Sequence, residues 1–75
     1  MDEYVVTVEY GGLVMGEWKF ANYEEALKMY HYAMMQRKRG TKVYMITLFS
    51  AQPSHSDTII HQYIYHAEVG AIVDI

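Results

Sequence analysis

The chain has 75 residues, of which 52% are hydrophobic, 20% are charged and none is cysteine. This composition argues against a disordered segment, and the lack of cysteine excludes disulfides and thiolate metal sites as sources of stability. The formal net charge is −3, yet four of the six Lys and Arg residues lie between positions 37 and 42. We therefore expect one small domain, residues 1–75, whose stability is modest or shared with a partner, because so short a chain buries only about 60% of its unfolded surface.

The first 20 residues predict a β-hairpin. Residues 3–10, EYVVTVEY, alternate in polarity, as does a strand with one buried face. Gly11 and Gly12 follow, and glycine readily adopts the positive φ angles that a two-residue hairpin turn requires. Residues 13–20, LVMGEWKF, form the predicted returning strand, with Val14, Trp18 and Phe20 on one face.

A helix is predicted from residue 23 to residue 39. Asn22 is a favourable N-cap, and Glu25 stands three residues later, where it can complete a capping box. The cations at 37–39 suit the negative end of the helix dipole, and Gly40 suits the left-handed position beyond it. Helical periodicity places six side chains on the side that we expect to lie on a sheet: Tyr23, Ala26, Leu27, Tyr30, Ala33 and Met34.

Two further strands are predicted after the helix, over residues 42–50 and 57–66, with a loop around Pro53 between them. The first of these strands is apolar on both faces, a pattern typical of a central strand covered on each side. Residues 67–75 form an apolar tail that Gly70 could interrupt. The order of elements is therefore β-β-α-β-β, followed by a tail.

The predicted fold class is α+β: a single small domain with an antiparallel four-stranded sheet, one helix packed on one face, and an extra apolar C-terminal tail. A right-handed crossover from the second strand through the helix can place the third strand beside the first. We therefore favour the strand order 2-1-3-4, with other orders left open.

The outer side of the predicted helix carries more apolar side chains than a solvent-exposed helix face usually does. Met29, Tyr32 and Met35 form a diagonal at spacing i, i+3, i+6. One interpretation is that Met29 packs at the edge of the core and the other two are singly exposed, which is common. The other is that a contiguous apolar patch binds a partner, with basic residues at its rim. On that interpretation the partner-binding residues are Met29, Tyr32, Met35, Gln36, Arg37 and Arg39.

The second face of the predicted sheet also lacks a cover. One helix covers one face of a four-stranded sheet, yet the strands 42–50 and 57–66 are apolar on both faces. The tail could fold back over the second face, pair along an edge strand, or cross to another subunit. A homodimer formed by tail exchange or by face-to-face sheet packing would cover the apolar side chains of this second face. Two-fold dimers are the commonest closed assembly. We therefore expect a homo-oligomer.

The nearest approach to a metal site is the set His55, Asp57 and His61, because residues 57 and 61 would share a strand face and His55 lies in the loop beside them. No fourth ligand or supporting residue is marked in the sequence. No nucleophile elbow, phosphate-binding glycine loop or paired-carboxylate motif occurs either. We therefore expect no metal, no cofactor and no catalytic residue, in a protein that is not an enzyme.

Weak nucleic-acid binding is the alternative function. The run RKRGTK, residues 37–42, could contact phosphates, and tyrosines on an open sheet face could stack on bases. Against this, the chain as a whole is acidic, and the helix dipole alone explains cations at the end of a helix. A membrane partner is not expected, since no apolar run approaches the roughly 20 residues that a membrane span needs.

The segment 20–49, FANYEEALKMYHYAMMQRKRGTKVYMITLF, combines an aromatic strand end, a capped helix ending in basic residues and glycine, and a β-rich strand. This layout resembles that of small uncharacterised proteins of bacteriophages and mobile elements. The resemblance implies a role in binding and inhibiting or redirecting a host protein, such as a defence system, and it brings no catalytic residues. We therefore expect a cytoplasmic, non-enzymatic protein-binding module, located in the host cytoplasm if phage-encoded, with an unidentified host factor as its partner.

Overall fold

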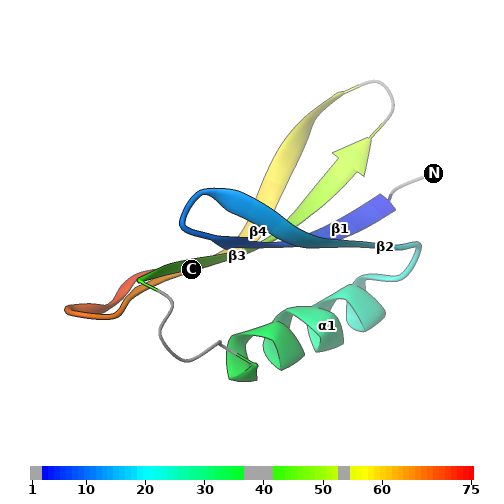
Figure 1. The fold of residues 1–75 in the computed structure, drawn as a ribbon. Helices are drawn as coiled ribbons and strands as arrows, with labels where there is room; N and C mark the ends of the chain where they lie inside the picture. Colours follow the sequence, from blue (N-terminus) through cyan, green and yellow to red (C-terminus); the bar gives the residue numbers. More distant parts are fainter. Residues whose placement is uncertain (1–2, 37–41, 53–54) are drawn as a thin grey trace.

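The computed structural model describes residues 3–36, 42–52 and 55–75. The elements in chain order are β1 (Glu3–Tyr10), β2 (Leu13–Phe20), α1 (Tyr23–Met35), β3 (Val43–Gln52), β4 (His55–His66) and β5 (Gly70–Asp74). The strands form one antiparallel sheet in the order β2-β1-β3-β4-β5, and α1 lies across one face of it (Figure 1).

The predicted α+β class is confirmed, but the sheet has five strands rather than four. The expected order 2-1-3-4 is present, with β5 added beside β4. The predicted tail, residues 67–75, is a turn followed by β5, so the structure shows the tail paired along an edge strand. Alternation did not reveal this strand because Ile72 is an extra residue in a bulge, which leaves Ala71, Ile72 and Val73 as an unbroken apolar run.

The turn between β1 and β2 has the predicted form. Tyr10 pairs with Leu13, so the turn contains two residues, Gly11 and Gly12, with φ angles of 58° and 88°. Positive φ at both central positions matches the type of turn that follows the twist of a hairpin. A side chain at either position would be strained, which explains the glycine pair.

A bulge in the β1–β2 ladder overturns one predicted side-chain direction. Val8 pairs with Gly16, but the next residue, Glu9, pairs with Val14. The extra residue, Met15, inverts the alternation of β2. Val14 therefore lies on the face opposite to Trp18, rather than sharing a face with it.

The start of α1 lies where the sequence predicts it. Asn22 is the N-cap, and its side-chain oxygen accepts hydrogen bonds from the main-chain N–H groups of Glu24 at 2.8 Å and Glu25 at 3.3 Å. These bonds satisfy donors that a helix start leaves free. The described helix ends at Met35, whereas the prediction extended it to residue 39. The cations at 37–39 and the predicted cap at position 40 lie outside the described residues.

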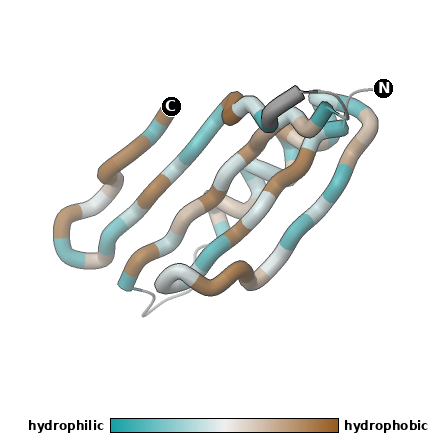
Figure 2. Tube along the Cα trace, turned by 90° about the horizontal axis from the view of Figure 1, so that it is seen from above, coloured by the Kyte–Doolittle hydropathy of each residue, from teal (hydrophilic) through white to brown (hydrophobic). Residues whose placement is uncertain are grey.

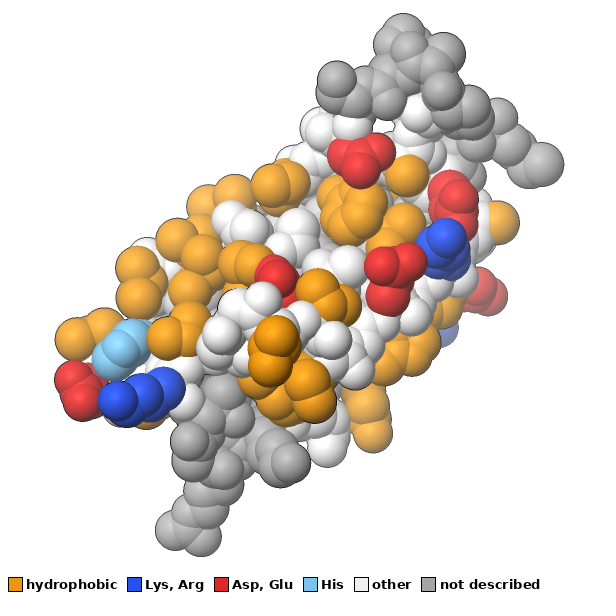
Figure 3. Space-filling model, turned by 45° about the horizontal axis from the view of Figure 1, so that its top comes forward, with side chains coloured by type: hydrophobic (Ala, Val, Ile, Leu, Met, Phe, Trp, Pro, Cys, Tyr) orange, Lys and Arg blue, Asp and Glu red, His pale blue; other side chains and the backbone are white. Residues whose placement is uncertain are grey.

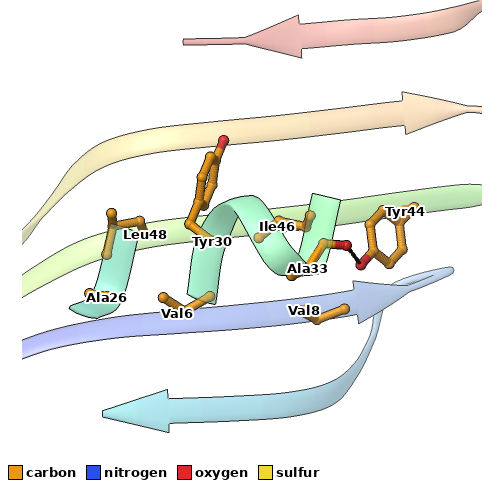
Figure 4. Packing of buried hydrophobic residues seen from close by; sticks show 8 residues of the cluster. All are labelled: Val6, Val8, Ala26, Tyr30, Ala33, Tyr44, Ile46 and Leu48. Carbon is orange, nitrogen blue, oxygen red and sulfur yellow. Dashed lines mark hydrogen bonds between the residues drawn. The ribbon is translucent and has the colours of Figure 1, made fainter. Parts of the chain in front are cut away.

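The hydrophobic core lies between α1 and the three strands β1, β3 and β4. All six helix side chains predicted to face the sheet are buried there or pack against the buried group. Figure 4 shows the eight buried residues: Val6, Val8, Ala26, Tyr30, Ala33, Tyr44, Ile46 and Leu48. Burying one large aliphatic side chain contributes about 1.5–3 kcal/mol, so this cluster is the main source of stability between the two layers.

The molecule is elongated, with extents of 40 × 21 × 20 Å and a radius of gyration of 12.4 Å. A compact chain of this length has a radius of gyration of about 11 Å. The reason is visible in Figure 1, where the turn joining β4 to β5 projects beyond the C-terminal end of α1. Among the described residues, no helix has both the length and the apolarity that crossing a lipid bilayer requires.

Candidate interaction surfaces

The apolar diagonal predicted on the outer side of α1 is divided in the structure. Met29 is half-buried and packs against the core, whereas Tyr32 is 57% exposed and Met35 is 81% exposed. Gln36, the C-cap of α1, is also exposed. We call Tyr32, Met35 and Gln36 the outer helix surface. The predicted rim residues Arg37 and Arg39 lie outside the described residues.

Register shifts in β4 affect two of the predicted metal-ligand candidates. Leu48 of β3 pairs with His61, but Phe49 pairs with Ile59, so β4 contains one extra residue at this point. The extra residue inverts the alternation that the sequence pattern assumed. Ile59 therefore lies on the opposite face of the sheet from His61. Asp57 lies at a second register shift, between the pairs Ser50–Thr58 and Gln52–His55, so the alternation that put Asp57 and His61 on one face does not hold.

His61 connects α1 with the end of the chain. Its Nε2 lies 3.1 Å from the Tyr23 hydroxyl, and its Nδ1 lies 3.1 Å from the main-chain oxygen of Ile75. Because a carbonyl oxygen only accepts, Nδ1 is the donor in the second bond. The third candidate ligand, the side chain of His55, lies outside the described residues. Within the described part of the chain, no three His, Asp or Glu side chains are grouped as a metal ion would require.

Tyr30 is buried beside His61, and its hydroxyl points toward β4 (Figure 4). The ring centroids of Tyr30 and His61 are 5.6 Å apart. The hydroxyl has no hydrogen-bond partner among the described residues. The pKa of Tyr30 is raised from 10.0 to about 12, chiefly by burial, and the nearby Asp74 and Tyr63 contribute to this rise in the same direction. The phenol therefore stays protonated at neutral pH, as a donor without an acceptor.

The face of the sheet opposite α1, which we call the open face, has a polar centre. Thr47 is only 7% exposed there, and its hydroxyl oxygen accepts a hydrogen bond of 3.4 Å from the Gln62 side chain. Val5, on the same face, is 3% exposed. Neighbouring strands of the twisted sheet thus bury part of this face without a partner. Figure 3 shows hydrophobic side chains in patches, with uncharged polar, backbone and acidic surface between them.

The tyrosines of the sheet do not lie on the open face, where the nucleic-acid alternative requires them. Five tyrosines of β1, β3 and β4 belong to the core cluster or pack against it on the helix side: Tyr4, Tyr10, Tyr44, Tyr63 and Tyr65. Tyr63 and Tyr65 stack with ring centroids 6.4 Å apart. Of the basic run 37–42, only Lys42 lies within the described residues, and it is exposed.

The outer edge of β5 is the second apolar surface. Val69 in the preceding turn is 72% exposed, Ile72 is 57% exposed and Ile75 is 65% exposed. We call these three residues the β5-edge cluster. Figure 2 shows β5 as the outermost strand of the sheet, with apolar residues along it.

The opposite edge of the sheet, β2, has a different character. Glu17 and Lys19 project from it and form an exposed ion pair with a separation of 3.8 Å. The bulge at Met15 also interrupts its regular backbone. Charged side chains hinder the pairing of an edge strand with another chain, whereas a bulge does not distinguish β2 from β5, which contains one at Ile72. Exposed apolar side chains occur on β2 as well, where Leu13, Val14 and Met15 are 70%, 59% and 60% exposed. Among the described edge strands, β5 differs from β2 in carrying a single charged residue, Asp74, where β2 carries two.

Comparisons with known proteins give no relative from which a site could be transferred. No protein-family model, no curated protein and no solved structure matches the chain. The described residues form no pocket either. The exposed apolar surfaces are therefore the features from which a function can be proposed.

Proposed function

We propose that this protein is a non-enzymatic protein-binding module that forms a homodimer and acts as a phage-type modulator of a host protein, for example of a defence system. The observation that carries the proposal is the exposure of apolar side chains at two separate places, the outer helix surface and the β5-edge cluster. Grouped apolar side chains with polar surroundings are typical of protein-interaction sites.

The outer helix surface is the proposed contact with the host protein. Tyr32 and Met35 lie one turn apart on α1, and both are more than half exposed. Tyrosine provides a large apolar ring with a polar tip, and methionine adapts its shape to the partner. Gln36 supplies hydrogen-bonding groups beside them, and in this proposal Arg37 and Arg39 steer an acidic partner toward the surface.

A double variant, Tyr32→Glu with Met35→Glu, tests this contact. Because both side chains are exposed, the variant should fold with the circular dichroism spectrum and melting temperature of the wild type. It should lose the host protein that the wild type captures from a host lysate, and titration calorimetry with that purified protein should show roughly a hundredfold weaker binding, as expected for the loss of two interface anchors.

Lys19→Glu is the matched control, because it changes the net charge by the same two units on β2, away from α1. This control should bind the host protein as the wild type does. Unchanged binding by the double variant would remove the outer helix surface from the proposal. Loss of folding in the double variant would place Tyr32 and Met35 in the core instead.

A further inference from the structure

We infer that two copies of this chain associate through their β5 strands, which pair antiparallel about a two-fold axis and join the two sheets into one. The inference rests on the self-association included in the proposed function and names the surface responsible for it. Each copy contributes its five strands, so the joined sheet has ten strands.

The backbone of β5 has hydrogen-bonding groups that β4 does not use. Gln62 and Ile75 exchange both main-chain bonds, with N···O distances of 3.0 Å and 3.3 Å. In an antiparallel ladder the next residue along the strand directs its N–H and C=O groups to the other side. Those of Asp74 therefore point away from β4. The bulge residue Ile72 is the extra residue of β5 in its register with β4.

One register satisfies these groups and keeps like charges apart. A two-fold axis at Val73 places Val73 opposite Val73 of the second copy and Ile72 opposite Asp74 of the second copy. The outward N–H and C=O groups of Asp74 then face Ile72 of the second copy. An axis at Asp74 would instead bring two carboxylates directly opposite each other, which is unfavourable.

The side chains along β5 favour a second copy of the same strand. Asp74 is the only charged residue in β5, and the exposed side chains of the β5-edge cluster are all aliphatic. Pairing edge to edge with the axis at Val73 brings the Val73 side chains of the two copies together and places Ile72 opposite Asp74. Face-to-face packing of two open faces would instead bury the polar centre formed by Thr47 and Gln62.

The two helices leave room for this pairing. α1 packs mainly on β1, β2 and β3 and also contacts β4 through Tyr23 and Tyr30, so β5 of each copy separates it from the junction. From β3 of one copy to β3 of the other there are five strand spacings, or about 24 Å at about 4.8 Å each. This exceeds the helix diameter of about 10–12 Å. Both helices therefore fit on the same side of the joined sheet.

Asp74→Pro is the sharpest test, because proline removes the outward N–H of residue 74 and leaves the bonds between Gln62 and Ile75 in place. Sedimentation equilibrium of the full chain should show a dimer for the wild type and a roughly hundredfold larger dissociation constant for the variant, as expected when two symmetry-related donors are lost. Asp74→Ala keeps the N–H group and is the matched control, which should dimerise at least as well as the wild type.

A second pair of variants does not depend on proline. Ile72→Lys places a charge at the junction and should also give monomers, whereas Ile59→Lys, at an exposed position of β4 away from the β5 edge, should remain dimeric. Circular dichroism confirms that each variant is folded. Amide hydrogen exchange gives a direct measurement, since protection of the Asp74 amide should rise with protein concentration in the wild type.

The outcomes separate this inference from the proposed function. If Asp74→Pro and Ile72→Lys both dimerise as tightly as the wild type, β5 is not the interface, and the proposed dimer uses another surface. If the wild type is monomeric at millimolar concentration, the self-association itself is overturned, while binding of the host protein to the outer helix surface stands or falls by its own test. Protection of the Asp74 amide only in the presence of the host protein would overturn the second copy as the occupant of this edge.

Discussion

The hydroxyl of Tyr44 in β3 donates a hydrogen bond to the main-chain oxygen of Ala33 in α1 (Figure 4). The same oxygen accepts a bond of 3.2 Å from the N–H of Gln36. Ala33 belongs to the last turn of the described helix, where carbonyl groups lack regular helical partners. Because Tyr44 is 1% exposed and Ala33 is 3% exposed, this bond joins the helix end to the sheet inside the core.

Replacing Tyr44 with phenylalanine should therefore destabilise the protein. The phenylalanine ring still fills the same space, but the buried carbonyl oxygen of Ala33 loses one of the hydrogen bonds that it accepts. This loss costs about 1 kcal/mol. For a domain of this size the melting temperature should fall by about 4–8 °C. Thermal unfolding followed by circular dichroism measures the change. Tyr32→Phe is the control, since Tyr32 is exposed and the same chemical change there should leave the melting temperature unaltered.

The same substitution at Tyr30 should have the opposite sign. The Tyr30 hydroxyl is buried and has no partner within the described part of the chain. Removing an unpaired buried hydroxyl should leave the free energy of unfolding unchanged or raise it by about 1 kcal/mol. Urea unfolding of Tyr30→Phe beside Tyr44→Phe measures both. A loss at Tyr30 as large as that at Tyr44 would mean that the hydroxyl has an acceptor after all.

Tyr30 also predicts a loss of stability at alkaline pH. Its pKa is raised from 10.0 to about 12, chiefly by burial, so the folded state holds this proton more tightly than the unfolded state does. The resulting stability is complete below pH 10.0 and is lost as the pH rises toward 12. Each pKa unit corresponds to about 1.4 kcal/mol. Urea unfolding at several pH values should show a steeper decline above pH 10 for the wild type than for Tyr30→Phe, and parallel curves would contradict the assignment.

Gly16 leaves space for the ring of Trp18. A Cβ atom at position 16 would lie 2.4 Å and 2.8 Å from two atoms of that ring. Since Trp18 is already 38% exposed, Gly16→Ala should push the indole toward solvent rather than prevent folding, at a cost of about 1 kcal/mol in lost apolar burial. Trp18 is the only tryptophan, so a red shift of the fluorescence emission reports the change. Glu17→Ala, on the other face of β2, should leave the emission unchanged.

The elements that local chemistry determines could be predicted from the sequence. Asn22 marks the start of α1, and Gly11 with Gly12 marks the first turn, because each meets a requirement of its own backbone position. The order of the first four strands followed from the handedness of the crossover. These features depend on residues close together in the chain or on a general rule of chain geometry.

The bulges could not be predicted, and they account for most of the differences. An extra residue at Met15, in β4 near Ile60, and at Ile72 inverts the alternation of each strand, and no residue type signals its position. The two register shifts in β4 removed the regular alternation on which the pairing of Asp57 with His61 depended, and the bulge at Ile72 concealed β5. A bulge depends on the partner strand and on the twist of the whole sheet, which a single strand sequence does not record.

The candidate surfaces were only partly accessible to prediction. Periodicity alone placed Met29 with Tyr32 and Met35, but the width of the core determined that Met29 packs inward. The β5-edge cluster required knowledge of which strand lies at the edge. The pairing of β1 with β3 followed from the predicted strand order. This ladder matters for the folding of the chain rather than for binding a partner.

That ladder is the only one in the sheet that joins strands far apart in the chain. β1 with β2, β3 with β4, and β4 with β5 each close short connections, whereas Tyr10 meets Tyr44 across the whole of β2 and α1. Closing a long loop costs chain entropy before any contact offsets it, so folding rates fall as such contacts become more important. The hairpins on either side can therefore form early, and the meeting of β1 with β3 under α1 should set the folding rate of the chain.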